Sequence, residues 1–402
     1  MATSNLLTHD VKSRKSSISN ASNDANRNFW FDAIRGLSAL AVCAGHLRAT
    51  AFVDYAHVEN KGVWQKLFYG LTSLGHEAVM VFFVLSGFFV GGSVLRNAAN
   101  FSFQSYAISR LTRLWLVLIP ALLLTAAIDL YLRVNAPGVL IGSYYALWSS
   151  GPSLENYSLS LTTFFGNVFF VQNILTPIFG SNGPLWSLAS EFWYYVAFPS
   201  AVLIFIAKKN QTRAIAVTIT VFLIAALSLI PRDNAIGLLL GYFVWLMGVG
   251  VYVLKDTLGN KNKYFIVPCT FLFGAVLAYS KIPNPSILFS KDIVVGFFFA
   301  LTALSIVNLK KPEKLPSIVH ALVIRLSDIS YSLYLFHFPI LIVLASKFHT
   351  GVQNQPNIAM FGIYLFELST LVALSVIAWW LFERRTNSVR AVVERLFKRQ
   401  CH

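Results

Sequence analysis

The sequence has little charge and little cysteine. Only 12% of its 402 residues are charged, whereas 56% are hydrophobic, and the mean hydropathy is +0.62. A chain of this composition cannot surround its apolar residues with a water-facing surface, which excludes a soluble enzyme of two or three domains. The cysteines, Cys43, Cys269 and Cys401, are widely spaced, so neither a disulfide framework nor a metal site is predicted.

Acidic residues are also scarce. The sequence has 17 Asp and Glu against 32 Lys and Arg. The basic residues are scattered in short loops between apolar runs and do not gather on one domain, so no nucleic-acid partner is predicted. Their distribution indicates membrane topology instead.

Long apolar runs recur along nearly the whole chain. Because about 20 apolar residues cross a bilayer as a helix, the sequence predicts an all-α, polytopic membrane helical bundle. Residues 1–28 are expected to be a disordered cytoplasmic tail, 29–383 the membrane domain and 384–402 a basic cytoplasmic tail. About ten transmembrane helices are expected, near 30–52, 74–95, 107–132, 184–207, 214–231, 236–254, 264–281, 290–308, 322–346 and 358–382.

One further apolar stretch, 159–175, is short and is followed by a segment rich in proline and glycine. We expect it to be re-entrant. Ten spans that start inside put 23 of the 32 basic residues on the cytoplasmic side, as the positive-inside rule requires. The prediction is therefore a multi-pass protein of the cell inner (plasma) membrane with both termini cytoplasmic.

Three ionisable residues are expected at similar depth in the outer half of the membrane. His46, Glu191 and His337 lie roughly 9–14 Å below the outer surface at 1.5 Å per helical residue. An ionisable group at this depth is costly and indicates a functional site or a wet cavity.

Four cationic residues, Arg35, Arg110, Arg113 and Arg325, are expected near the inner face. Arg110 and Arg113 are three positions apart, so they project from one side of a helix and can hold an anion. Arg35 and His46 are eleven positions apart, which places them on one helix face about 16 Å apart. This layout suits a phosphorylated donor inside, an acceptor outside and a group transferred between them.

Five sequence blocks, together with His46, resemble those of the acyltransferase-3 family of membrane acyltransferases, which includes O-acetyltransferases of surface polysaccharides. The likeness spans residues 29–383, and the blocks occur in the family's order on the predicted helices. They are 31–37 (FDAIRGL), 82–88 (FFVLSGF), 110–113 (RLTR), 184–192 (PLWSLASEF) and 330–339 (SYSLYLFHFP).

The resemblance implies acyl transfer from a cytoplasmic acyl-CoA, expected to be acetyl-CoA, to an extracytoplasmic carbohydrate or lipid-linked glycan. It also implies that His46 is essential and that Arg110 and Arg113 lie near the coenzyme. His46 suits a general base or a transient acyl acceptor, with Glu191 or His337 orienting it or binding the acceptor. No metal is expected.

Each candidate site residue also has a purely structural interpretation. Arg35 is one turn from Asp32 and can pair with it, Arg110 and Arg113 can be topology anchors, and Glu191 and His337 can serve packing. A proton-coupled transporter of a small anionic or sugar substrate also uses intramembrane ionisable groups. A scaffold within a polysaccharide-synthesis complex is the third alternative. The acceptor, the acyl chain length and the oligomeric state are left open.

Overall fold

The computed structural model describes residues 27–141, 157–257, 263–282, 290–349 and 353–400. The predicted tail 1–28 lies outside this part except for its last two residues. The described residues are almost entirely helical and contain isolated bridges but no strand. The all-α prediction is therefore confirmed.

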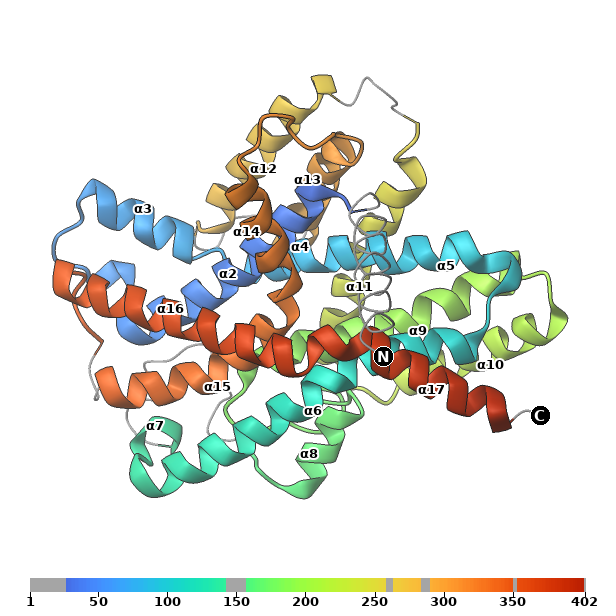
Figure 1. Cartoon of the computed structure of the whole chain (residues 1–402), viewed down its shortest axis with the longest axis horizontal. Helices are drawn as coiled ribbons and strands as arrows, with labels where there is room; N and C mark the ends of the chain where they lie inside the picture. Colours follow the sequence, from blue (N-terminus) through green and yellow to red (C-terminus); the bar gives the residue numbers. More distant parts are fainter. Residues whose placement is uncertain (1–26, 142–156, 258–262, 283–289, 350–352, 401–402) are drawn as a thin grey trace, which may run out of the picture.

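The first half of the chain is built from long and short helices (Figure 1). A π-helix, η2, continues α4 into α5, and short 3-10 turns flank several helices. The bounds are α2 Phe29–Ala51, η1 Tyr55–His57, α3 Val63–Thr72, α4 Gly75–Ser86, η2 Gly87–Gly91, α5 Gly92–Asn97, η3 Ala98–Asn100, α6 Phe103–Asn135, α7 Gly138–Ile141 and α8 Leu161–Val168.

The second half contributes most of the remaining long helices. A 3-10 turn, η6, leads into α9, and another, η8, joins the last two helices. The bounds are η6 Gly183–Leu185, α9 Trp186–Ile206, α10 Asn210–Leu227, α11 Arg232–Leu254, α12 Ile266–Ser280, α13 Lys291–Ile306, α14 Ser317–Asp328, α15 Ser330–Phe348, α16 Ile358–Leu381, η8 Glu383–Arg385 and α17 Thr386–Gln400.

In the described part of the chain, seven helical stretches are long and apolar enough to cross a membrane. All ten predicted segments are helical, but three do not meet that criterion. The α12 and α13 helices have 15 and 16 residues, and α2 carries Asp32, Arg35 and His46. Because α2 packs against α4, α14, α15 and α16, protein rather than lipid surrounds much of it (Figure 1). The count of ten stays a prediction.

The 159–175 segment does not form an eleventh spanning helix. It contains only the eight-residue α8, which at 1.5 Å per residue is far shorter than the roughly 30 Å hydrocarbon core. The irregular chain after α8 is held by Asn167, whose amide donates to the carbonyls of Thr163 and Pro177 and accepts from the amide of Phe179. Asp129 of α6 accepts from the amide and hydroxyl of Ser181.

The α4–η2 segment lies unusually close to α11. A Cβ added at Gly87 would collide with the carbonyl of Trp245, and one added at Gly248 would collide with the carbonyl of Val84. Small residues at both positions therefore allow the two backbones to touch, as is common between membrane helices. This crossing fixes η2, which forms one wall of the cavity described next.

Candidate active site

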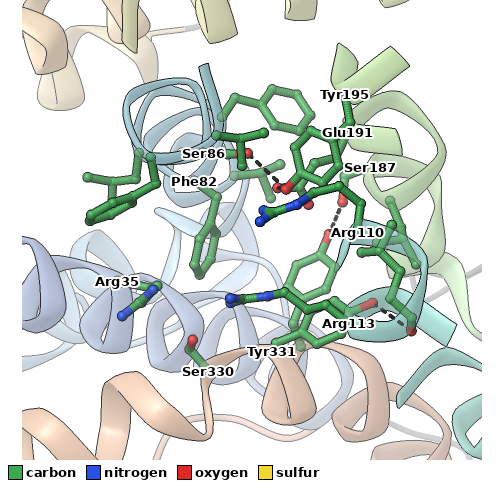
Figure 2. A pocket seen from close by; sticks show the side chains of 18 of the residues that line it. Arg35, Phe82, Ser86, Arg110, Arg113, Ser187, Glu191, Tyr195, Ser330 and Tyr331 are labelled. Carbon is green, nitrogen blue, oxygen red and sulfur yellow. Dashed lines mark hydrogen bonds between the residues drawn. The ribbon is translucent and has the colours of Figure 1, made fainter. Parts of the chain in front are cut away.

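A cavity of about 380 Å³ lies between α2, α4–α5, α6, α9 and the start of α15. Three of the four arginines expected near the inner face line it, and Figure 2 shows Arg35, Arg110 and Arg113 directing their guanidinium groups into it, whereas Arg325 is not among its lining residues. Arg96 of α5 also lines it, whereas Glu191 is the one carboxylate among the described lining residues. The cavity is therefore strongly cationic.

Arg110 and Arg113 are placed by the first turns of α6. The Nε of Arg110 is buried and has no hydrogen-bond partner among the described residues, and its Nη2 only approaches the Ser109 hydroxyl, at 3.3 Å. Arg113 forms no hydrogen bond or ion pair with a described residue. Guanidinium groups that line a cavity and form no ion pair with a described residue are suited to bind phosphate or carboxylate oxygens.

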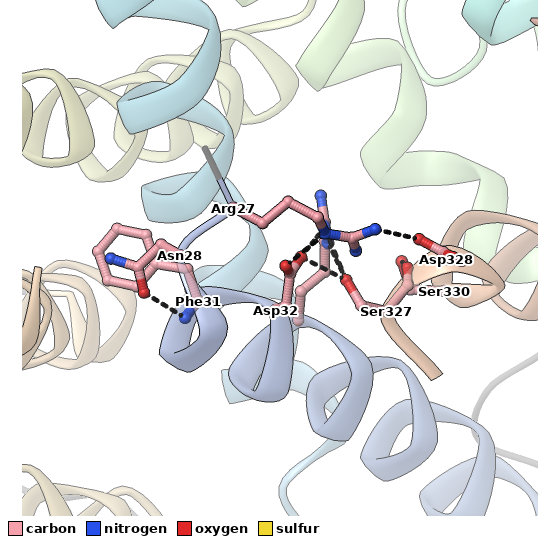
Figure 3. Close-up of polar contacts among 8 residues, drawn as sticks. Arg27, Asn28, Phe31, Asp32, Ser327, Asp328 and Ser330 are labelled. Carbon is pink, nitrogen blue, oxygen red and sulfur yellow. Dashed lines mark hydrogen bonds and ion pairs between the residues drawn. The ribbon is translucent and has the colours of Figure 1, made fainter. Parts of the chain in front are cut away.

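Arg35 has partners as well as a place in the cavity. It forms an ion pair with Asp32, and its Nε donates to the Ser327 hydroxyl at 3.0 Å. Figure 3 shows Asp32 at the centre of this group, where its carboxylate also accepts a hydrogen bond from Arg27. The alternative that Arg35 pairs with Asp32 is therefore correct, and the pair orients a guanidinium that still lines the cavity.

Arg27 ties the start of α2 to the end of α14. Its Nε lies 2.8 Å from Asp32 and its Nη1 lies 2.9 Å from Asp328. Burial lowers the pKa of Arg27, but the bonds and charges of the two carboxylates outweigh burial and raise the pKa above its ordinary value. These contacts fix the depth and rotation of α2, and thereby the positions of Arg35 and His46.

The structure places Glu191 in the cavity and not beside the histidines. Its carboxylate accepts a 2.5 Å hydrogen bond from the hydroxyl of Tyr195. The Tyr195 oxygen lies 3.1 Å from that of Ser86, which also accepts from the indole of Trp245 at 3.1 Å. No hydrogen bond joins Glu191 to His46 or His337 in the described part of the chain.

His46 and His337 are brought together from α2 and α15, 291 positions apart in sequence. His46 Nδ1 lies 2.8 Å from His337 Nε2, and the two rings are nearly parallel, with an interplanar angle of 8°. His337 is fully buried, whereas His46 is only partly buried. The edge of Phe338 packs against the His46 ring.

The hydrogen bonds fix the tautomers of the neutral pair. His337 Nδ1 lies 2.9 Å from the carbonyl oxygen of Leu333, and a carbonyl only accepts, so Nδ1 carries a proton. His337 Nε2 therefore accepts, and His46 Nδ1 donates to it. This leaves the lone pair of His46 Nε2 available to take a proton or attack a carbonyl carbon.

Tyr334 links the cavity to the histidine pair, and the sequence interpretation missed it. Its ring lines the cavity, and the ring centroid lies 6.1 Å from that of His337 and 6.2 Å from that of Phe82. Its hydroxyl lies 2.6 Å from that of Ser187. The signal was present, because Tyr334 precedes His337 by three residues and Ser187 precedes Glu191 by four, each one helical turn.

Other intramembrane ionisable residues have partners away from the cavity. Glu367 of α16 accepts from His349 Nε2 at 3.0 Å, and both side chains are fully buried. Glu77 pairs with Lys281 at 2.7 Å. Among the residues in the described ranges, no group of three His, Cys, Asp or Glu side chains could hold a metal ion.

Comparison with known proteins decides the class. The model of the acyltransferase-3 family, described as an acyltransferase domain, matches residues 28–383. The chain belongs to this family. It is therefore a membrane acyltransferase rather than a transporter or a scaffold. An O-acetyl transferase of Shigella phage Sf6 is 23% identical over 367 residues, covering 88% of this chain and 95% of that protein. No solved structure matches the chain.

Proposed function

We propose that this acyltransferase-3 protein moves an acetyl group from cytoplasmic acetyl-CoA to a hydroxyl of an extracytoplasmic carbohydrate, such as a surface polysaccharide or a lipid-linked glycan. Two features together support the proposal. One is a cavity in which Arg110 and Arg113 form no ion pair with a described residue. The other, past Tyr334, is a histidine pair in which His46 Nε2 makes no hydrogen bond within the described part of the chain. The name of the phage relative, an O-acetyl transferase, supports oxygen as the acceptor atom.

The proposal includes an orientation in the bacterial inner membrane. Ten spans with both termini inside keep the clusters Lys208–Lys209–Arg213 and Lys310–Lys311–Lys314 in the cytoplasm. Arg110 and Arg113 then face the cytoplasmic pool of acyl-CoA, and His46 lies nearer the outer surface.

In this scheme the arginines act on the donor's phosphates and not on the reacting carbon. No carboxylate of a described residue forms a hydrogen bond or ion pair with Arg110 or Arg113, so an entering phosphate gains charge-assisted bonds without breaking such a pair. Arg35 is held by Asp32 and Ser327 and presents a guanidinium of fixed position to the same anion.

The chemical step uses the lone pair of His46. A hydroxyl of the acceptor gives its proton to His46 Nε2 while its oxygen attacks the thioester carbonyl carbon. The carbon–sulfur bond then breaks, and the departing thiolate takes the proton back from His46, which yields an ester and free CoA. His337, which accepts from His46 Nδ1, orients the ring and stabilises its protonated form.

A covalent route uses the same atom. His46 Nε2 attacks the thioester carbon directly, the thiolate leaves, and the acyl group passes to the acceptor hydroxyl in a second step. Rapid quenching of the enzyme with labelled acetyl-CoA and no acceptor distinguishes the routes, because only the covalent route leaves label on His46.

Purified protein tests the function directly. In detergent or nanodiscs, it is given acetyl-CoA with a labelled acetyl group and a panel of glycans extracted from the cell surface. Labelled ester should form with the unmodified protein and be lost in His46→Ala. Movement of a sugar or anion across a proteoliposome membrane, with no ester formed by the unmodified protein, would contradict the proposal.

A further inference from the structure

A second cavity of about 430 Å³ adjoins the arginine cavity at its α5–α6 end. Ser93, Arg96 and Arg110 line both cavities, so the two cavities are neighbours that share these side chains. Each has a volume within the roughly 300–1,000 Å³ of small-molecule sites. We call the space of about 430 Å³ the vestibule.

The side chains of the vestibule suit a phosphorylated nucleoside. Its lining includes the guanidinium groups of Arg96, Arg110 and Arg390, and no carboxylate of a described residue lines it. The amides of Asn97 and Asn100 add donors and acceptors, and several serine hydroxyls line the start of α6. These are groups that bind phosphate oxygens and ribose hydroxyls.

Aromatic rings in the vestibule add a surface for a base. Tyr106 and Phe101 both line it, and their ring centroids lie 5.3 Å apart. The Tyr106 hydroxyl donates to the carbonyl of Tyr195 at 2.9 Å, which fixes the ring. Stacking of a base on a fixed aromatic ring contributes about 1–3 kcal/mol in nucleic-acid-binding proteins.

Arg390 comes from α17, which lies beyond the family match at 28–383. Its Nε is held by Glu394, one turn later, at 2.7 Å, and its Nη atoms have no hydrogen bond to a described residue. The helix packs against α6, the helix that also carries Arg110. The C-terminal segment thus contributes an oriented, partly free guanidinium to the vestibule.

We infer that the vestibule binds the 3′,5′-phosphorylated adenosine end of the acyl donor and that Arg390 of α17 is one of its binding residues. This inference rests on the proposed function, because it assigns one end of the same donor. The arginine cavity then receives the pantetheine arm, which leads toward Tyr334. The site selects a thioester that carries a nucleotide over one carried by phosphopantetheine alone.

The test is a binding experiment with the purified full-length protein and three probes: CoA, adenosine 3′,5′-bisphosphate and free phosphopantetheine. Arg390→Ala should weaken CoA and the bisphosphate about tenfold and change phosphopantetheine less than about twofold. Arg395→Ala is the matched control, because it removes the same charge from an exposed position of the same helix, outside the vestibule lining. It should leave all three affinities unchanged.

Three results would overturn the inference. They are wild-type nucleotide affinity in Arg390→Ala, an equal loss of phosphopantetheine affinity, and an equal nucleotide loss in Arg395→Ala, which would indicate general surface charge. The melting temperature of each variant shows whether it is folded. Arg390→Lys, which keeps the charge, should recover part of the CoA affinity.

If the unmodified protein binds CoA and transfers acetyl but its CoA affinity does not depend on Arg390, only the vestibule assignment fails. If it neither binds CoA nor transfers acetyl, the proposed function fails.

Discussion

The arginine cavity and the histidine pair differ in how far their polar groups are satisfied. In the cavity, Arg113 and the Nε of Arg110 have no hydrogen-bond partner among the described residues, so the site is suited to an anion that comes from outside the protein. In the histidine pair, His337 uses both ring nitrogens on neighbours, and His46 Nε2 has no hydrogen bond to a described residue. The first arrangement favours binding and the second favours a single chemical step.

The largest expected effect comes from the histidine that has the free nitrogen. His46→Ala should lower kcat by about 10²–10⁴-fold, the usual contribution of a general acid–base group, and leave the affinity for CoA unchanged. Steady-state kinetics measure the loss of kcat, and a binding titration measures the affinity for CoA. His57→Ala, which changes an exposed histidine, is the control. A tenfold loss of CoA affinity in His46→Ala would show that the histidine pair also binds the donor, which contradicts the division between binding and chemistry.

Replacing the second histidine should separate orientation from packing. His337→Leu removes the acceptor for His46 Nδ1 and should lower kcat about 100-fold, whereas His337→Gln keeps an acceptor oxygen and should lower kcat only about tenfold. KM for acetyl-CoA should stay constant in both. Equal losses in the two variants would show that His337 fills space and does not set the tautomer of His46.

The cavity arginines should affect KM rather than kcat. Arg110→Ala removes charge-assisted bonds worth about 1.5–3 kcal/mol each, so KM for acetyl-CoA should rise about 10–100-fold. Arg110→Lys, which keeps a charge but not the planar fork, should give a smaller rise. A lower kcat with unchanged KM would indicate that Arg110 acts in the chemical step and not in donor binding.

The buried pair that Glu367 of α16 forms with His349 at the end of α15 should have the smallest effect on catalysis. Glu367→Ala leaves His349 without its partner at a fully buried site, which costs about 1–3 kcal/mol of folding free energy. The melting temperature should fall, while kcat of the folded enzyme should stay within about twofold. A large loss of kcat in folded protein would add this pair to the active site.

The sequence predicted Arg35, Arg110, Arg113 and Arg325 near the inner face, and the first three line one cavity, whereas Arg325 does not line it. The spacing of Arg110 and Arg113 already put those two on one face of a helix. The depth estimate, in contrast, put Glu191 at the level of the histidines. Distance along a helix axis does not say which neighbouring helix a side chain faces, and Glu191 faces the cavity.

Other features were out of reach because they depend on contacts between distant segments. His46 and His337 were expected at the same depth, yet their hydrogen bond and tautomers follow only from how α2 packs on α15. Arg96 and Arg390 lie outside the five sequence blocks, so the sequence did not assign them to the site. The predicted spans near 264–281 and 290–308 are helices, but α12 and α13 are too short to settle the count of ten.

Sealed inside-out membrane vesicles test the central claim most directly, because their outer face is the cytoplasmic one. Acetyl-CoA with a labelled acetyl group is added outside, and the glycan acceptor is enclosed within. The account predicts labelled ester inside the vesicles with the unmodified protein and none with His46→Ala. Ester that forms only when donor and acceptor share one side of the membrane would contradict it.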